Sequence, residues 1–365
     1  MKLFKQLLVA PAAIGFLAPF SVSASEINLD AISKYSNDNL EIDGNSFQKE
    51  SSNKILLSGG EGLVDSSSDI TGGFSETTTA SFGVDFLVGA VDGASSEATT
   101  FDYQMGIGLE TSFTGEDALS ATIDIGNAGS AVGGEDGLNF DSTDDVLTLD
   151  GLTYTFPVGG ATVMVGDNTD ISAVYTGACA YSAFTDYMGN CGTGNSVGVG
   201  GNGATAAMSY AFDSGFSLAG GVSSTPTSIL TEEGADTFGI EAAYTADSYG
   251  LALAYADAEA TTYWGFNGNY AFDFATISAG IESQDDGTEA TGFFVGLSFA
   301  EVGAGSLDIG MGTTGNFADA DTEYYIYEAS YAYPLNDGMT ITPGVYIREG
   351  TTDETGFAVK TSFSF

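Results

Sequence analysis

The residues able to do chemistry in this sequence are almost all carboxylates. The 365 residues include 50 aspartates and glutamates, two cysteines and no histidine. Without histidine, Ser-His and Cys-His nucleophilic sites and imidazole-held metal sites cannot form. A pair of carboxylates can hydrolyse a glycosidic bond, but no pair stands out from the other acids. The sequence therefore predicts no catalytic residue, no metal, no cofactor and a protein that is not an enzyme.

The two cysteines bracket the most distinctive segment, residues 167–203 (DNTDISAVYTGACAYSAFTDYMGNCGTGNSVGVGGNG). Connections this long are usually functional, and a solvated loop would not normally carry so many large apolar groups. We predict that it folds inward against a wall, held by a Cys179–Cys191 disulfide, and narrows the interior. The alternative is packing outside, over the mouth or against a neighbouring subunit. The candidate residues of this constriction are Asp167, Asp170, Tyr175, Tyr181, Phe184, Asp186 and Tyr187.

The elements that would hold this loop repeat with a period of two. In FDYQMGIGLETSF, residues 101–113, the apolar Phe101, Tyr103 and Met105 alternate with polar or small residues such as Asp102 and Gln104. Such alternation over about ten residues is typical of a strand with one apolar face, and its repetition is typical of a membrane β-barrel. No segment after the first 24 residues offers about 18 consecutive apolar residues, so no transmembrane helix is predicted.

Sixteen segments follow this pattern, and we predict an all-β fold, a transmembrane antiparallel barrel over residues 76–365. Segment four is irregular at Asp150-Gly151, which indicates a bulge. The segments are 76–90, 99–113, 118–127, 146–157, 160–167, 204–212, 215–224, 235–246, 249–258, 262–272, 275–284, 290–300, 304–313, 322–334, 338–348 and 355–365.

The connections support a barrel over two alternatives. Those after odd-numbered segments are generally the longer ones, and those after even-numbered segments are tight, as in outer-membrane barrels. A secreted β-sandwich would also alternate, but here the polar face is rich in Gly, Ser and Ala while aromatic residues lie near strand ends. A calcium-binding β-solenoid would need a nonapeptide period, which the sequence lacks.

If the apolar face meets lipid, the opposite face lines water and carries charge. Acidic rings favour cations and repel anions, although any one acid can be a merely solvated wall residue. Arg348 and Lys360 share this face and could set up a transverse field or simply form salt bridges. Asp257 falls on the apolar face, at a strand end. The predicted wall residues are Asp85, Asp102, Glu110, Asp124, Glu241, Glu282, Asp308, Glu328, Arg348 and Lys360.

The N-terminal residues are typical of an export signal. Lys2 and Lys5 precede an apolar run from Leu7 to Phe20, and a small-residue cleavage site ends at Ala24. A retained anchor is the alternative, but Pro11 and Pro19 interrupt the run. We predict that residues 1–24 are removed and that residues 25–75, rich in Ser, Asn, Asp and Gly, form an irregular periplasmic segment. Export makes a disulfide plausible.

The charge excludes one class of partner. The chain carries 7 basic residues against its 50 acids, a formal net charge of −43. Nucleic acid binding requires clustered cations, so nucleic acid is not a predicted partner.

Four stretches carry a resemblance to a known family. They are the start MKLFKQLLVAPAAIGFLAPF, the loop YTGACAYSAFTDYMGNCGTGNSVG, YAFDSGFSLAGGVSS and the terminal VKTSFSF. The sequence resembles the outer-membrane porins of marine picocyanobacteria, distant relatives of the carbohydrate-selective (OprB-type) porins. Many cyanobacterial porins carry a surface-layer-homology domain after the signal. Residues 25–75 are too short for one.

The resemblance implies a sixteen-stranded, trimeric barrel with its third loop folded inside. It also implies that terminal Phe365 is read by the outer-membrane assembly machinery. The expected function is passive diffusion of small hydrophilic solutes and inorganic ions, with cations and neutral molecules favoured, in contact with outer-membrane lipid. A carbohydrate-preferring channel and a non-conducting structural barrel are the alternatives.

Overall fold

A computed structural model of the protein describes residues 78–93, 98–127, 143–185, 188, 203–231, 234, 236–313 and 324–364. The predicted signal at 1–24, the segment 25–75, Asp186, Tyr187, Cys191 and Phe365 lie outside the described residues. Among the described residues, no helix is long and apolar enough to cross a membrane.

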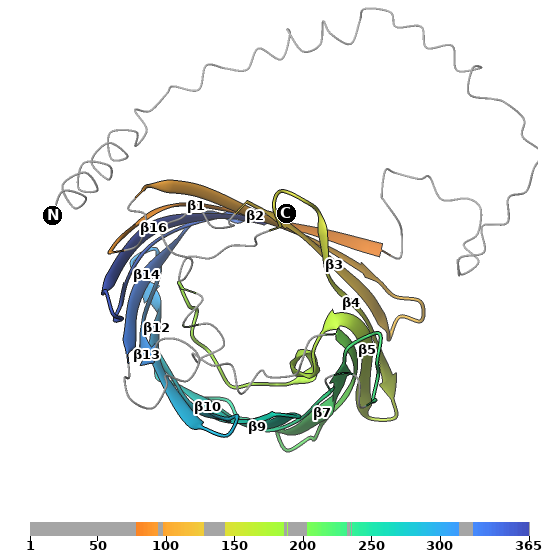
Figure 1. Ribbon diagram of the computed structural model, residues 1–365. Helices are drawn as coiled ribbons and strands as arrows, with labels where there is room; N and C mark the ends of the chain where they lie inside the picture. Colours follow the sequence, from red (N-terminus) through yellow and green to blue (C-terminus); the bar gives the residue numbers. More distant parts are fainter. Residues whose placement is uncertain are drawn as a thin grey trace, which may run out of the picture. The chain divides into compact units, whose positions relative to one another are not determined.

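In the described part of the chain, sixteen strands form one closed antiparallel barrel, which confirms the predicted sixteen-stranded β-barrel (Figure 1). The strands are β1 (Thr78–Asp92), β2 (Thr100–Thr111), β3 (Ala118–Gly126), β4 (Thr148–Val158), β5 (Ala161–Thr169), β6 (Gly203–Ala211), β7 (Phe216–Ser224), β8 (Asp236–Thr245), β9 (Tyr249–Ala258), β10 (Thr261–Ala271), β11 (Thr276–Asp285), β12 (Glu289–Val302), β13 (Gly305–Thr313), β14 (Tyr325–Asn336), β15 (Met339–Arg348) and β16 (Glu354–Ser364).

Each strand pairs with its neighbours in sequence, and β1 closes the ring by pairing with β16. In this closing pair, Gly83 lies opposite Ser364 and Asp92 opposite Thr355. The start of β1 and the end of β16 therefore lie at the same rim of the barrel, as an even number of antiparallel strands requires. Closure matters because a free strand edge would leave backbone groups without partners.

The alternation of side chains gives the wall two different faces. In β9, Tyr249, Leu251, Leu253 and Tyr255 are exposed, while the glycine and alanines between them are buried. The same holds in β8, where Ile240 is exposed and Glu241 is buried. The outer face thus carries large apolar side chains and the inner face small or polar ones.

Two local predictions are also confirmed. Between β3 and β4, Thr122 pairs with Gly151 and Ile123 with Leu149, so Asp150 is the extra residue of a bulge. The connections after even-numbered strands are short, such as Gly159-Gly160 between β4 and β5, and the longest connection follows β5.

Candidate functional site

Residues 170–185, which follow β5, run along the inward face of the wall. Their contacts fall in chain order on β6, β8, β9, β10, β11 and then β12 to β15. In Figure 1 the yellow-green trace of this segment lies within the ring of strands. We call residues 170–185 the inner belt.

The inner belt begins with a single turn of 3-10 helix, Ile171–Val174. Asp170 caps this turn because its Oδ1 accepts a hydrogen bond of 2.6 Å from the backbone N–H of Ser172. Ile171 is buried against Met164 of β5 and Ala207 of β6, and Tyr175 packs on the same cluster. The helix therefore fixes the direction in which the belt leaves the wall.

Glu241 of β8 provides the first polar anchor of the belt. Its carboxylate accepts hydrogen bonds from the backbone N–H groups of Thr176, at 2.6 Å, and Gly177, at 3.1 Å. Gly177 has φ +59°, a conformation that favours glycine and lets both amides face one carboxylate. Hydrogen bonds to a charged acceptor are roughly twice as strong as neutral ones.

The middle of the belt is held by neutral polar groups. Asn269 Nδ2 of β10 donates to the carbonyl of Ala178 at 2.8 Å, and the N–H of Ala180 donates to Ser278 Oγ of β11 at 3.1 Å. Ala178 lies against buried Ala243 and Ala252. The small residues on both sides allow the belt backbone to approach the wall closely.

Glu328 of β14 is the second acidic anchor and accepts four hydrogen bonds. The donors are the hydroxyl of Tyr181 at 2.7 Å, the N–H groups of Phe184 and Thr185 at 2.9 Å each, and the Thr185 hydroxyl. Burial, together with this carboxylate, raises the pKa of the Tyr181 phenol, so the hydroxyl stays a donor. Nearby, Asp308 of β13 accepts from Ser298 and from the N–H of Ser182.

Glycines in the wall provide the notches that receive the belt aromatics. A Cβ placed on Gly296 would lie 2.4 Å from the Tyr181 ring, and one on Gly310 would lie 2.5 Å from its hydroxyl. A Cβ on Gly344 would lie 2.5 Å from the ring of Phe184. These three positions on β12, β13 and β15 tolerate no larger side chain while the belt is in place.

Apolar residues on the inward face complete this contact and were missed by the sequence interpretation. Leu87, Phe294, Ile326 and Tyr346 are buried with Met188, Tyr181 and Phe184. The rings of Tyr181 and Phe294 stack at a tilt, with centroids 5.1 Å apart. The alternation in the sequence already placed these four wall residues on the inward face. An apolar residue at an inward position is the signal that something covers it.

Five of the seven predicted constriction residues, all but Asp186 and Tyr187, lie among the described residues. Asp167 lies in β5 and not in the loop, because the strand extends to Thr169. It pairs with Leu152 of β4, and both residues lie at outward-facing positions. Asp170 caps a helix turn, and Tyr175, Tyr181 and Phe184 pack against the wall. Cys179 is disulfide-bonded.

The predicted wall acids divide by exposure. Asp102, Glu241, Glu282, Asp308 and Glu328 are buried. Asp85 and Asp124 are half-buried, and Glu110 is exposed. No group of three or more potential metal-ligating acids or cysteines occurs in the described part of the chain.

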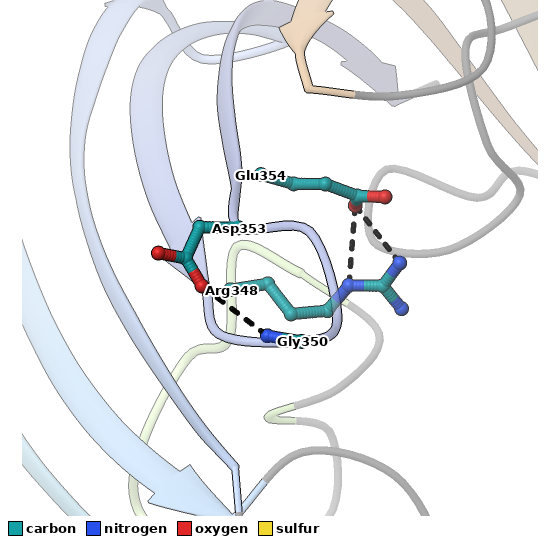
Figure 2. Close-up of polar contacts among 4 residues, drawn as sticks. All are labelled: Arg348, Gly350, Asp353 and Glu354. Atoms are coloured by element: carbon teal, nitrogen blue, oxygen red, sulfur yellow. Dashed lines mark hydrogen bonds and ion pairs between the residues drawn. The ribbon is translucent and has the colours of Figure 1, made fainter.

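The two basic wall residues differ from each other. Arg348 Nη2 forms an ion pair of 2.9 Å with Glu354 Oε2 across the turn between β15 and β16, and Figure 2 shows the guanidinium facing this carboxylate. The N–H of Gly350 donates to Asp353 within the same turn. Lys360 of β16 lies opposite Leu87 and Thr342 and forms no ion pair with another described residue.

Comparison with known proteins gives matches of structure only. No family model matches the chain, and no curated protein matches it. Pseudomonas putida OprB is similar with a TM-score of 0.62 and 11% identity over 79% of this chain and 94% of that one. OmpT of Vibrio cholerae, with loop L8 deleted, gives 0.58 and 10% over 80% and 100%. A variant of the Rh. blastica porin gives 0.55 and 16% over 79% and 100%. The shared feature is the barrel fold.

Proposed function

We propose that this chain is an outer-membrane porin, a passive diffusion channel for small hydrophilic solutes and inorganic ions. The observation that carries the proposal is that the closed ring of strands has an apolar outer face and a polar inner face. Ile240 is 62% exposed on the outside, whereas its neighbour Glu241 is turned inward and 2% exposed. A closed barrel with an apolar exterior satisfies its backbone groups within a bilayer, and a polar interior is compatible with water.

In this proposal the inner belt narrows the passage and thereby sets the size limit for solutes. Support comes from the acidic anchors Glu241 and Glu328, which tie the belt to the wall at two separated points. The acidic wall favours cations and neutral solutes over anions. No step of energy coupling is part of the proposal.

The proposal includes an export route and partners. Residues 1–24 serve as a cleaved signal, Phe365 as the assembly signal, and the mature chain forms a homotrimer in outer-membrane lipid. Each of these rests on the sequence patterns and the resemblance described above. Cross-linking in detergent and N-terminal sequencing of protein from the membrane fraction test them directly.

Planar-bilayer recording of purified protein tests the channel itself. We expect discrete conductance steps that scale with salt concentration. A barrel that binds the bilayer and gives no steps would establish the structural alternative instead. Liposome swelling with neutral sugars of increasing size then separates a general channel, with rates falling smoothly with size, from a carbohydrate-preferring one.

A further inference from the structure

The inner belt divides the wall of the barrel into a covered part and an open part. On β13 and β15, a Cβ at Gly310 or Gly344 would meet belt side chains at 2.5 Å. On the inward face of β1, a Cβ at Gly83 would meet no atom within 4 Å, and one at Gly106 of β2 only Asp124 Oδ1. Among the described residues, open space beside the wall therefore lies at Gly83 of β1 and Gly106 of β2. Farther along β1 the wall is covered, because the inward Leu87 is buried in the cluster that contains Met188.

The exposed side of the inner belt is neutral within residues 170–185. Its exposed residues are small and uncharged, and the only acid within 170–185, Asp170, caps a helix turn. Glu241, Asp308 and Glu328 lie beneath the belt, where their carboxylates accept its backbone N–H groups. The exposed belt residues are Ala173, Thr176, Cys179, Ala180 and Ser182.

The open part of the wall carries two carboxylates beside Gly83 and Gly106. Gly83 of β1 pairs with Gly106 of β2, and Gly106 pairs in turn with Asp124 of β3. Two residues along β1, on the same face, Asp85 pairs with Gln104. The Asp85 carboxylate accepts a hydrogen bond of 2.9 Å from Gln104 Nε2 and remains half-exposed. Asp85 and Asp124 therefore border the open space above Gly83 and Gly106.

We infer that Asp85 and Asp124 determine the cation preference of the channel, whereas Glu241, Asp308 and Glu328 position the belt and add little to charge selection. The inference rests on the proposed channel function. A carboxylate acts on a passing ion through the water between them, and at 0.1 M salt this reach is about 10 Å. Acids whose oxygens already accept belt donors are shielded from the passage by the belt itself.

Reversal potentials in a tenfold KCl gradient test this assignment. We expect Asp85→Asn with Asp124→Asn to lower the ratio of cation to anion permeability at least twofold, with conductance steps retained. Asp257→Asn removes one charge from the outward face of β9 and should leave the ratio unchanged. A double variant with the wild-type ratio, or an equal shift in Glu241→Gln alone, would overturn the inference.

A second measurement avoids variants that change the native charges. Gly83→Cys places a thiol in open space, and modification after reconstitution by a thiol reagent carrying a quaternary ammonium adds one positive charge beside Asp85. The permeability ratio should fall on modification, and an uncharged reagent of similar size should leave it unchanged. Equal ratios after both reagents would contradict the inference. Absence of conductance in the wild type would instead contradict the proposed function.

Discussion

The hydroxyl of Tyr181 donates a hydrogen bond of 2.7 Å to the carboxylate of Glu328, which lies 147 positions later in the chain. The same carboxylate accepts the backbone N–H groups of Phe184 and Thr185. One wall residue thus fixes the end of the inner belt that lies farthest from β5. This relationship makes Glu328 the most direct point at which to disturb the belt.

Glu328→Ala should release this end of the belt. Leaving a buried donor without an acceptor costs about 1–3 kcal/mol. The belt should therefore detach from the wall and should not stay in place with the N–H groups of Phe184 and Thr185 unpaired. We expect larger and noisier single-channel conductance, and a smaller effect in Glu328→Gln, which keeps an acceptor oxygen. Asp102→Asn is a matched control, because Asp102 is equally buried and accepts a hydrogen bond from the hydroxyl of Thr100, which lies outside the belt. Unchanged conductance in Glu328→Ala would contradict the anchoring role.

Leucine at Gly344 and at Gly83 should have opposite consequences. At Gly344 the new side chain occupies the site of the Phe184 ring, so the belt must move and thermal stability should fall. At Gly83 it enters open space, so stability should hold while conductance falls. Thermal unfolding followed by circular dichroism, together with bilayer recording, measures both. The reverse pattern would place the open space against β15 instead of β1.

Cysteines at adjacent positions of β3 should report the two faces of the wall. Thr122 is exposed and pairs with the inward Gly108, whereas Ile123 lies on the outward face. In reconstituted protein, Thr122→Cys should react with a membrane-impermeant thiol reagent and Ile123→Cys should not. Labelling is quantified by mass spectrometry. Preferential labelling of Ile123→Cys would invert the assignment of lipid and water faces.

Asp117, in the turn between β2 and β3, should make stability depend on pH. Burial alone would raise its pKa, but hydrogen bonds from Thr114, Tyr154 and Ser112 together lower the pKa well below the ordinary value. A lowered pKa in the folded state stabilises the fold above the unfolded value of about 3.9, and this stabilisation is lost as pH falls below it. The melting temperature of Asp117→Asn should therefore lie below wild type at pH 7, and the gap should narrow at pH 3. A gap that widens in acid would contradict this.

The strands could be read from the sequence because the environment of each residue repeats every two positions. The predicted 249–258 coincides with β9, and even the bulge at Asp150 was visible as a break in alternation. Strand ends were less certain. β5 continues past the predicted end to Thr169, which moved Asp167 out of the loop.

The division of the wall acids could not be read from the sequence. Asp85 and Glu328 both lie at inward-facing strand positions with similar sequence neighbours, yet only Glu328 is covered by the belt. The difference depends on the path of residues 170–185 across nine strands, which no local pattern specifies. Leu87 and Phe294 were the available hints, as apolar residues at inward positions.

Pairing of β1 with β16 gives the ring a seam between the first and last strands of the described chain. Until β16 arrives, β1 and β15 each keep a row of open backbone groups, which hydrocarbon penalises by several kcal/mol apiece. In the proposed outer-membrane setting, an incomplete ring would therefore expose unpaired backbone groups to hydrocarbon, and we expect the β1–β16 seam to close as the barrel inserts. Contacts this distant in the chain also form slowly, so we expect the pairing of β16 with β1 to be a late step of folding.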